Sequence, residues 1–315
     1  MIPETKTMQI EIGGKTVTIE TGKYAQSTNG SVTVRCGDTM LFVHAVVSKE
    51  PRVGIDFFPL LIDYEERMSS IGRIPGGYNR SEGKASDKAI LVSRLIDRPI
   101  RPLFPKGYRN DIQIVAQLFS YDQENQPDTL AMLGASCALM LSGAPFEGPI
   151  GAVRVSRDAE GNFIANPTHR QAKESDLDIV VSGTHDSVIM VEAGCKFVTE
   201  DDIMNAVEFA QIEIRKQCEA QVAFAQECGI VKEEFVNPYD TTEIKNITLH
   251  KKNKRKDANP NCIEMGDKVK FNFNGKDKVF TVKKITDKLV TLNGLISTKP
   301  EDLTLVRYNN GYKKL

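Results

Sequence analysis

Residues 93–105 read Ser-Arg-Leu-Ile-Asp-Arg-Pro-Ile-Arg-Pro-Leu-Phe-Pro, and this stretch decides how the first three quarters of the chain are interpreted. Arg94, Arg98 and Arg101 recur at i, i+4 and i+7, a spacing that places side chains on one face of a helix. The prolines predict that this helix bends or ends near Ile100, so that Arg101 lies at its exit. Because a guanidinium stays charged and presents a flat fork of donors that fits phosphate, the pattern favours a polyanion site.

A second interpretation of the same arginines is structural. Charged residues at helical spacing commonly face solvent and pair with nearby carboxylates, and Asp87 and Asp97 lie close by in the sequence. The spacing alone does not separate the two interpretations, and both stay open.

Length and charge indicate more than one part. A chain of 315 residues is typical of one large domain or two smaller ones, and 40% hydrophobic residues suffice for a proper core. The net charge of -1 hides an asymmetry, because residues 241–315 hold 17 Lys and Arg against 8 Asp and Glu, while residues 1–240 hold 24 against 34. A basic segment of this kind favours nucleic-acid binding.

The cysteines and the apolar runs bear on the compartment. No Cys-x-x-Cys pair occurs, and no histidine stands at ligand spacing from a cysteine, which predicts free thiols in a reducing compartment and no structural zinc. The first residues show no signal-peptide pattern, and no apolar run approaches the ~18 residues of a membrane span. We therefore expect a cytoplasmic protein that does not contact a membrane.

Strand patterns dominate the chain up to about residue 193. Alternation and turn residues predict strands that include residues 9–12, 16–20, 31–35, 40–47, 111–119, 177–184 and 187–193. A helix capped by Asp128 follows the fifth of these strands, and a longer one is predicted from Glu200 to about Glu227. Strands that precede helices, with few βαβ units, indicate an α+β domain.

The Gly-Arg-Ile-Pro-Gly-Gly motif at residues 72–77, together with residues 93–105, closely resembles the first core domain of bacterial polynucleotide phosphorylases. The resemblance extends from about residue 6 to about residue 235. It implies an RNase PH-like (ribosomal protein S5 domain 2-like) core domain over residues 1–235 that ends in a helix.

The resemblance also implies a role for the loop after this motif. In the family the loop lines the central pore of a trimer, where single-stranded RNA enters, and it carries an aromatic pair followed by two basic residues. Here Tyr78 keeps one aromatic ring and Arg80 one cation, whereas Asn79 and Ser81 depart from the pattern and Lys84 replaces an arginine. Stacking on a base combined with a cation on the phosphate binds RNA without sequence preference.

We therefore expect a weakened RNA contact at the pore, because fewer cations mean lower affinity. An alternative for Tyr78 is that its ring caps an edge of the core. The expected RNA-binding residues are six in number: Tyr78, Arg80, Lys84, Arg94, Arg98 and Arg101.

Two carboxylates at a predicted strand entry also need an assignment. Asp176 and Asp178 could hold a metal or act as acid and base, but a polar strand entry is the favoured interpretation. In the resembling family a second core domain supplies the metal-binding aspartates, within Gly-Asp-Met-Asp-Phe-Lys, and a phosphate-binding serine cluster. Neither motif occurs in this sequence. The family implies Mg²⁺ and inorganic phosphate, yet we expect this chain alone to bind neither, and we assign no catalytic residue and no metal ligand.

The resemblance ends near residues 236–240, and the rest of the chain differs in character. A basic linker is expected over residues 236–260, with Lys-Lys-Asn-Lys-Arg-Lys at 251–256. Short alternating strands at about ten-residue spacing, with Asn-Gly turns at 274–275 and 293–294, predict a small all-β barrel over residues 261–310. The pattern is similar to SH3-like or KOW-type modules.

Two functions are compatible with these observations. In the first, the chain is an RNA-binding subunit in phosphate-dependent 3′-to-5′ RNA degradation, part of a homo-trimer or of a hetero-oligomer with a phosphorylase chain, and another chain supplies the second core domain. In the second, it is a non-catalytic RNA-binding or assembly protein built from a truncated phosphorylase domain and a basic β-barrel. A decaying gene fragment is a third possibility.

Overall fold

A computed structural model describes residues 4–51 and 54–235, together with the strand residues 268–273, 276–285, 290–292, 296–298 and 304–306. The chain divides into two compact units, Met1–Asn237 and Pro238–Leu315. Each unit is described by itself.

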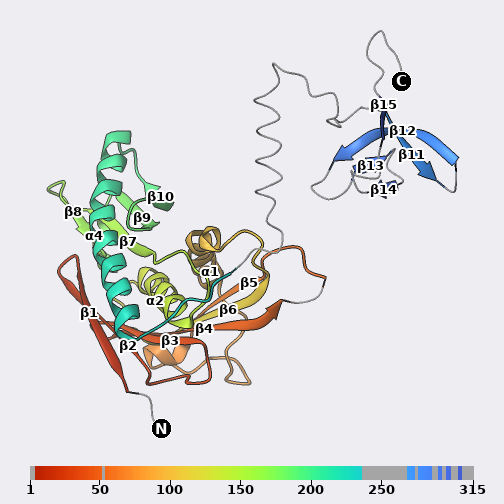
Figure 1. Cartoon of the computed structure of the whole chain (residues 1–315). Helices are drawn as coiled ribbons and strands as arrows, with labels where there is room; N and C mark the ends of the chain where they lie inside the picture. The colour runs from red at the N-terminus through yellow and green to blue at the C-terminus, as the bar shows by residue number, and fades with distance from the viewer. Residues whose placement is uncertain are drawn as a thin grey trace. The chain divides into compact units, whose positions relative to one another are not determined.

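The first unit begins with a six-stranded sheet of strand order β1-β2-β3-β4-β6-β5 (Figure 1). Neighbouring strands are antiparallel except for β5 and β6, which run parallel. Alternate residues of the first hairpin point into the core, which is the period of a sheet with one covered face. The predicted strands of this region are confirmed; their bounds are β1 (Lys6–Ile12), β2 (Lys15–Thr21), β3 (Gly30–Cys36), β4 (Thr39–Pro51), β5 (Leu60–Glu66) and β6 (Asn110–Ser120).

A four-stranded sheet of order β10-β9-β7-β8 forms the second layer. It consists of β7 (Gly151–Arg157), β8 (Phe163–Ala165), β9 (Leu177–Gly183) and β10 (Val188–Cys195), all paired antiparallel. The β9–β10 hairpin agrees with the alternation of its residues. Neither β8 nor the six-residue helix α3 (His169–Glu174) was predicted, because so few residues carry no readable period.

Helix α2 (Pro127–Ser142) contacts β3, β4 and β6 of the first sheet and β7 of the second. It is buried on nearly its whole circumference, as expected for a helix that is apolar all round. A Cβ on Gly134 would lie 2.7 Å from a methyl carbon of Val43, so this glycine allows the helix to approach the sheet closely. Helix α4 (Glu200–Glu227) has the predicted bounds and packs against β7 and β9.

The structure corrects the predicted cap of α2. The N-cap residue is Gln126, and Asp128 lies within the first turn, after Pro127. The Asp128 carboxylate accepts a hydrogen bond from the backbone N–H of Thr129 through one oxygen and from Arg154 on β7 through the other. Local capping rules cannot show the second of these partners.

Helix α1 (Asp87–Ile100) behaves as the prolines predict. It ends at Ile100 with Pro99 in its last turn, and a 3-10 turn, η2 (Arg101–Leu103), comes next. The hydroxyl of Ser86 caps its start by accepting from the backbone N–H of Ala89 at 3.2 Å. A second 3-10 turn, η1 (Met68–Ile71), comes after β5.

In the second unit the described residues form a five-stranded antiparallel sheet of order β14-β13-β12-β11-β15. Its strands are β11 (Lys268–Phe273), β12 (Lys276–Ile285), β13 (Val290–Leu292), β14 (Ile296–Thr298) and β15 (Thr304–Val306). Four of these overlap predicted strands, and β14 was not predicted. The SH3-like or KOW-type assignment stays a prediction, and the expected linker over residues 236–260 lies outside the described residues.

The cysteines of the described part are free thiols, as the sequence predicts. Cys36, Cys137 and Cys218 are buried free thiols, and Cys195 and Cys228 are free as well. Within the described ranges no helix combines the length and the apolar character that crossing a membrane requires.

Candidate nucleic-acid interface

The predicted arginine face belongs to α1, whose opposite face is part of the core. Val92, Leu95 and Ile96 are buried, while Arg94 and Arg98 are exposed on the other side. The helix is therefore amphipathic, and its cations face outward.

The Arg101 guanidinium is already engaged in hydrogen bonds with neighbouring groups. Its guanidinium forms a fork with the Asp97 carboxylate at 2.8 and 3.2 Å, and it donates to the backbone carbonyls of Phe58 and Leu60 at 3.2 and 3.1 Å. It also lies over the Phe58 ring, 5.9 Å from the centroid. These contacts tie the end of α1 to the segment that leads into β5. The structural interpretation fits this arginine, whose assignment to RNA stays a prediction.

The other two arginines are held less firmly. Arg98 has one ion-pair contact within the described ranges, from Nη1 to Oε2 of Glu192 on β10 at 3.2 Å, and both side chains are more than half exposed. For Arg94, no ion pair or side-chain hydrogen bond occurs within residues 4–51 and 54–235. A cation without a partner is free to hold an anion.

The loop of residues 72–86 leads into α1 and is exposed over nearly its whole length. It begins at Gly72 in the left-handed conformation, with φ 71°. Tyr78 is fully exposed, at 103%, so its ring does not cap the core. Arg73, Arg80 and Lys84 are exposed, and their side chains have no ion-pair partner within the described part of the first unit. An aromatic ring and several free cations thus lie on one continuous segment with Arg94.

A cavity of about 590 Å³ lies between this loop, the end of β5 and the start of α1. Three carboxylates line it, and each accepts hydrogen bonds locally. Glu65 accepts from Arg67 at 2.7 and 3.1 Å, which lowers the pKa of that carboxyl group. Glu66 accepts from Tyr64 and Lys88, and Glu82 from a backbone N–H. Lys84 also lines the cavity, without a partner in the described ranges.

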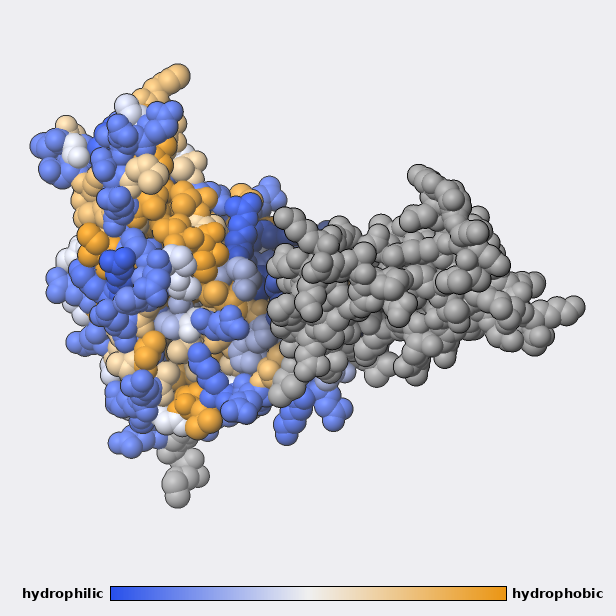
Figure 2. Space-filling model, turned by 45° about the horizontal axis from the view of Figure 1, so that its top comes forward, coloured by the Kyte–Doolittle hydropathy of each residue, from blue (hydrophilic) through white to orange (hydrophobic). Residues whose placement is uncertain are grey.

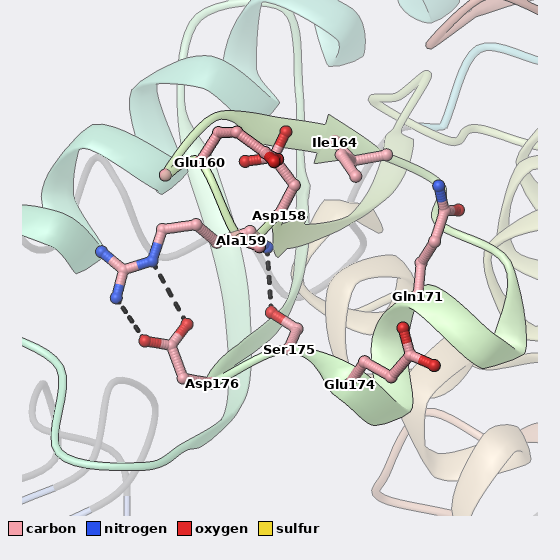
Figure 3. A pocket seen from close by; sticks show the side chains of 10 residues that line it. Asp158, Ala159, Glu160, Ile164, Gln171, Glu174, Ser175 and Asp176 are labelled. Atoms are coloured by element: carbon pink, nitrogen blue, oxygen red, sulfur yellow. Dashed lines mark hydrogen bonds and ion pairs between the residues drawn. The ribbon is translucent and has the colours of Figure 1, made fainter.

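Asp176 belongs to a different cavity, of about 500 Å³, between the β7–β8 turn and α3 (Figure 3). Its carboxylate accepts two hydrogen bonds from Arg157, one of them at 3.2 Å, and these lower its pKa. Arg157 also contacts Asp202 at 3.2 Å. Figure 3 shows Asp158, Glu160 and Glu174 around the same space, so carboxylates outnumber the guanidinium of Arg157, which is already paired. This cavity is unsuited to phosphate.

Asp178 is equally committed, to Arg154. The guanidinium forms two bonds of 2.7 Å to Asp178 and one of 2.6 Å to Asp128. No group of three or more His, Cys, Asp or Glu side chains that could hold a metal occurs among the described residues. Asp176 and Asp178 each form an arginine pair, and their interpretation as a polar strand entry stays a prediction. Within residues 4–51 and 54–235, both carboxylates are thus engaged by guanidinium groups and are not arranged as a set of metal ligands.

Sequence reasoning identified one of the two carboxylates that pair with these arginines and missed the other. Glu192 lies 94 residues from Arg98, and no local signal could have paired them. Asp97 is four residues before Arg101, and that spacing did identify it as a possible partner.

Comparison with known proteins gives consistent matches over the first unit. Residues 13–145 match the "3' exoribonuclease family, domain 1", and residues 148–213 match "domain 2" of the same family. The polyribonucleotide nucleotidyltransferase of Heliobacterium modesticaldum is 56% identical over 218 residues, which are 69% of this chain and 30% of that protein. That of Finegoldia magna is 48% identical over 239 residues, which are 76% of this chain and 33% of that protein.

The chain thus spans about a third of the length of these curated relatives. Among solved structures, rice Rrp46 matches with a TM-score of 0.53 at 11% identity, over 72% of this chain and 96% of that one. At this identity the match concerns the fold, and it agrees with an RNase PH-like arrangement of the first unit.

Proposed function

This chain belongs to the 3′ exoribonuclease family, whose two domains together match well over half of its residues, and from this premise we propose that it is an RNA-binding subunit in phosphate-dependent 3′-to-5′ RNA degradation. The observation that carries the proposal is the exposed segment formed by the 72–86 loop and α1. It presents Tyr78 together with Arg73, Arg80 and Arg94, three exposed cations that have no ion-pair partner within the described part of the first unit. A base stacks on the ring and the cations hold the backbone phosphates, which suits single-stranded RNA.

We further propose that another chain supplies the residues that carry out phosphorolysis. Phosphorolysis needs a pocket for inorganic phosphate and a group that stabilises the leaving oxygen. In this chain Asp176 and Asp178 are held by arginines. The start of α2, where backbone N–H groups could have met an anion, instead carries Pro127 and the Asp128 carboxylate. Mg²⁺ and phosphate would accordingly bind with the partner rather than with this chain alone.

The direct test is phosphate-dependent release of nucleoside diphosphates from poly(A) by the purified full chain, with Mg²⁺ or Mn²⁺ present. We expect no release above a no-protein control, together with RNA binding that weakens as salt increases. Release that co-purifies with the chain and disappears in the Asp176→Asn or Asp178→Asn variant would contradict the proposal and assign catalysis to those carboxylates.

A non-catalytic RNA-binding or assembly role is the second candidate, and the arginine-paired carboxylates favour it equally. The two candidates differ in what happens when a phosphorylase chain with a second core domain is added. A subunit of the degradation machinery would raise phosphorolysis by that chain, whereas an RNA-binding protein with another role would leave it unchanged or lower it by competing for RNA.

An edge of the second sheet supports an oligomeric arrangement. Among the described strands β10 pairs with β9 alone, so its other edge is open. It is exposed along most of its length, Val191 included, and Phe197 just beyond it is fully exposed, at 109%, with φ 54°. Figure 2 shows hydrophobic surface gathered on the side where α4 and this sheet come forward. Open apolar edges of this kind are usually covered by a partner. We propose that another 3′ exoribonuclease-family domain covers it at Val191 and Phe197, in a homo-trimer or with a phosphorylase chain. The neighbouring Glu192 side chain, which contacts Arg98 of α1, points to the opposite face of the strand from Val191 and stays outside this contact.

The mass of the full chain in solution tests this arrangement. We expect an oligomer for the wild type and a smaller species for Phe197→Asp, because the carboxylate would have to be buried at the contact. Val231→Asp, which alters a residue that is 86% exposed elsewhere, serves as the control. Equal masses for all three proteins, measured by light scattering after gel filtration, would rule out this edge as the contact.

The basic second unit fits the same proposal as an added RNA-binding module. An excess of Lys and Arg over residues 241–315 favours contact with the RNA backbone. We propose an SH3-like or KOW-type barrel there and a cytoplasmic location for the whole protein, where its RNA substrates would be encountered.

A further inference from the structure

The three arginines on α1 and at its exit differ in how many hydrogen bonds and ion pairs their side chains already form. Arg101 is fixed by four hydrogen bonds, and Arg94 has no side-chain partner within the described ranges. Arg98 is intermediate, since its ion-pair contact in the same ranges is the one to Glu192 at 3.2 Å. An RNA phosphate can therefore bind Arg94 directly, whereas it must displace the Glu192 carboxylate to bind Arg98.

Glu192 is placed so that it can be displaced. It lies on the edge strand β10 and its side chain is 57% exposed, while that of Arg98 is 64% exposed. Its sheet pairing with Val180 is made by the backbone and does not involve the carboxylate. A single contact between two exposed side chains is weak. A phosphate can accept two parallel bonds from the same guanidinium, which makes it the stronger partner.

We propose that Glu192 competes with RNA phosphate for Arg98 and thereby limits the affinity of this surface for RNA. The inference rests on the proposed RNA-binding function and adds a residue that tunes it. Glu192 occupies the guanidinium before RNA arrives, so that a phosphate must displace it. Glu192 makes no contact with the RNA in this scheme and acts through Arg98.

Binding of a fluorescent oligo(A) to the full chain at several salt concentrations tests the proposal. We expect Glu192→Gln to tighten binding about threefold to fivefold at low salt. Because Arg98 then makes a full phosphate contact, log affinity should fall more steeply with log salt, by about 0.7 in slope. The gain should vanish when Arg98→Ala is also present. Glu11→Gln, which removes a charge from the far edge of the first sheet, should change neither quantity.

Comparing these variants distinguishes failure of the proposed competition from failure of the proposed RNA-binding function. If Arg94→Ala weakens binding but Glu192→Gln leaves affinity and slope unchanged, the competition is refuted and RNA binding stands. If the gain from Glu192→Gln persists in the Arg98→Ala background, the effect is one of net charge and the proposal is again wrong. If the wild type does not bind and Arg94→Ala changes nothing, the proposed function fails and the inference fails with it.

Discussion

Replacing Arg154 by alanine is expected to lower the free energy of unfolding of the first unit by about 3–5 kcal/mol. Arg154 on β7 lies between the carboxylates of Asp128 and Asp178, at 2.6 and 2.7 Å, and the three side chains are only 20%, 13% and 27% exposed. Without the guanidinium, two mostly buried negative charges would face each other with no compensating donor. Such a loss exceeds what an exposed ion pair contributes, because water cannot replace the missing partner.

Guanidinium denaturation of the full chain, followed by far-UV circular dichroism, would measure this effect. Arg35→Ala is the matched control, since Arg35 pairs with Asp38 at the surface and both side chains are more than half exposed; a change below about 0.5 kcal/mol is expected. Adding Asp128→Asn and Asp178→Asn to Arg154→Ala should recover part of the loss by removing the unpaired charges. A loss below about 1 kcal/mol for Arg154→Ala alone would show that solvent screens this group.

The parts of the fold that could be predicted are those set by short-range patterns. Alternation defined the first hairpin and the β9–β10 pair, and the 3.6-residue period defined α4 at both ends. Proline geometry defined the end of α1 at Ile100. Each of these rests on the conformational preference of a few adjacent residues, which tertiary contacts reinforced rather than opposed.

Tertiary contacts decided the points that sequence patterns missed. Asp128 has the residue type of an N-cap, but Gln126 is the N-cap residue, and the Asp128 carboxylate in the first turn also binds Arg154 on β7. The three-residue strand β8 exists because β7 offers it an edge. Neither effect leaves a periodic signal in the chain.

The candidate site was predictable in its residue types but not in their availability. Spacing placed Arg94, Arg98 and Arg101 on one side of a helix, and all three do lie on α1 or at its exit. Their partners in the described part are Asp97 close by in the chain, and Glu192 and the backbone carbonyls of Phe58 and Leu60, which lie more than 40 residues away. The three arginines of one sequence motif therefore differ in the structure. Arg101 is held by hydrogen bonds, Arg98 is paired with a carboxylate, and Arg94 has no side-chain partner within the described ranges.

Gly30→Ala is expected to destabilise the first unit by about 3 kcal/mol, the upper end of what overpacking usually costs. Gly30 opens β3 and lies against the C-terminal half of α2. A Cβ at this position would be 2.1 Å from the carbonyl oxygen of Ala138 and 2.9 Å from the backbone nitrogen of Ser142. Both are backbone atoms, so no side-chain rotation relieves the contact, and α2 would have to move away from the sheet that it covers.

Gly76→Ala separates this steric effect from the general effect of replacing glycine. Apart from Gly76 and its two chain neighbours, no heavy atom of the described residues lies within 4 Å of a Cβ built on Gly76, and its φ is not in the left-handed region. Alanine there should therefore be neutral or should stabilise by about 0.4–1 kcal/mol through the unfolded state. The same unfolded-state term favours Gly30→Ala, and a net loss in that variant must therefore come from the folded state. Equal stabilities for the two variants would mean that α2 yields easily. The position of β7, and of Arg154 on it, relative to the first sheet would then not depend on the close packing of α2 between the two sheets.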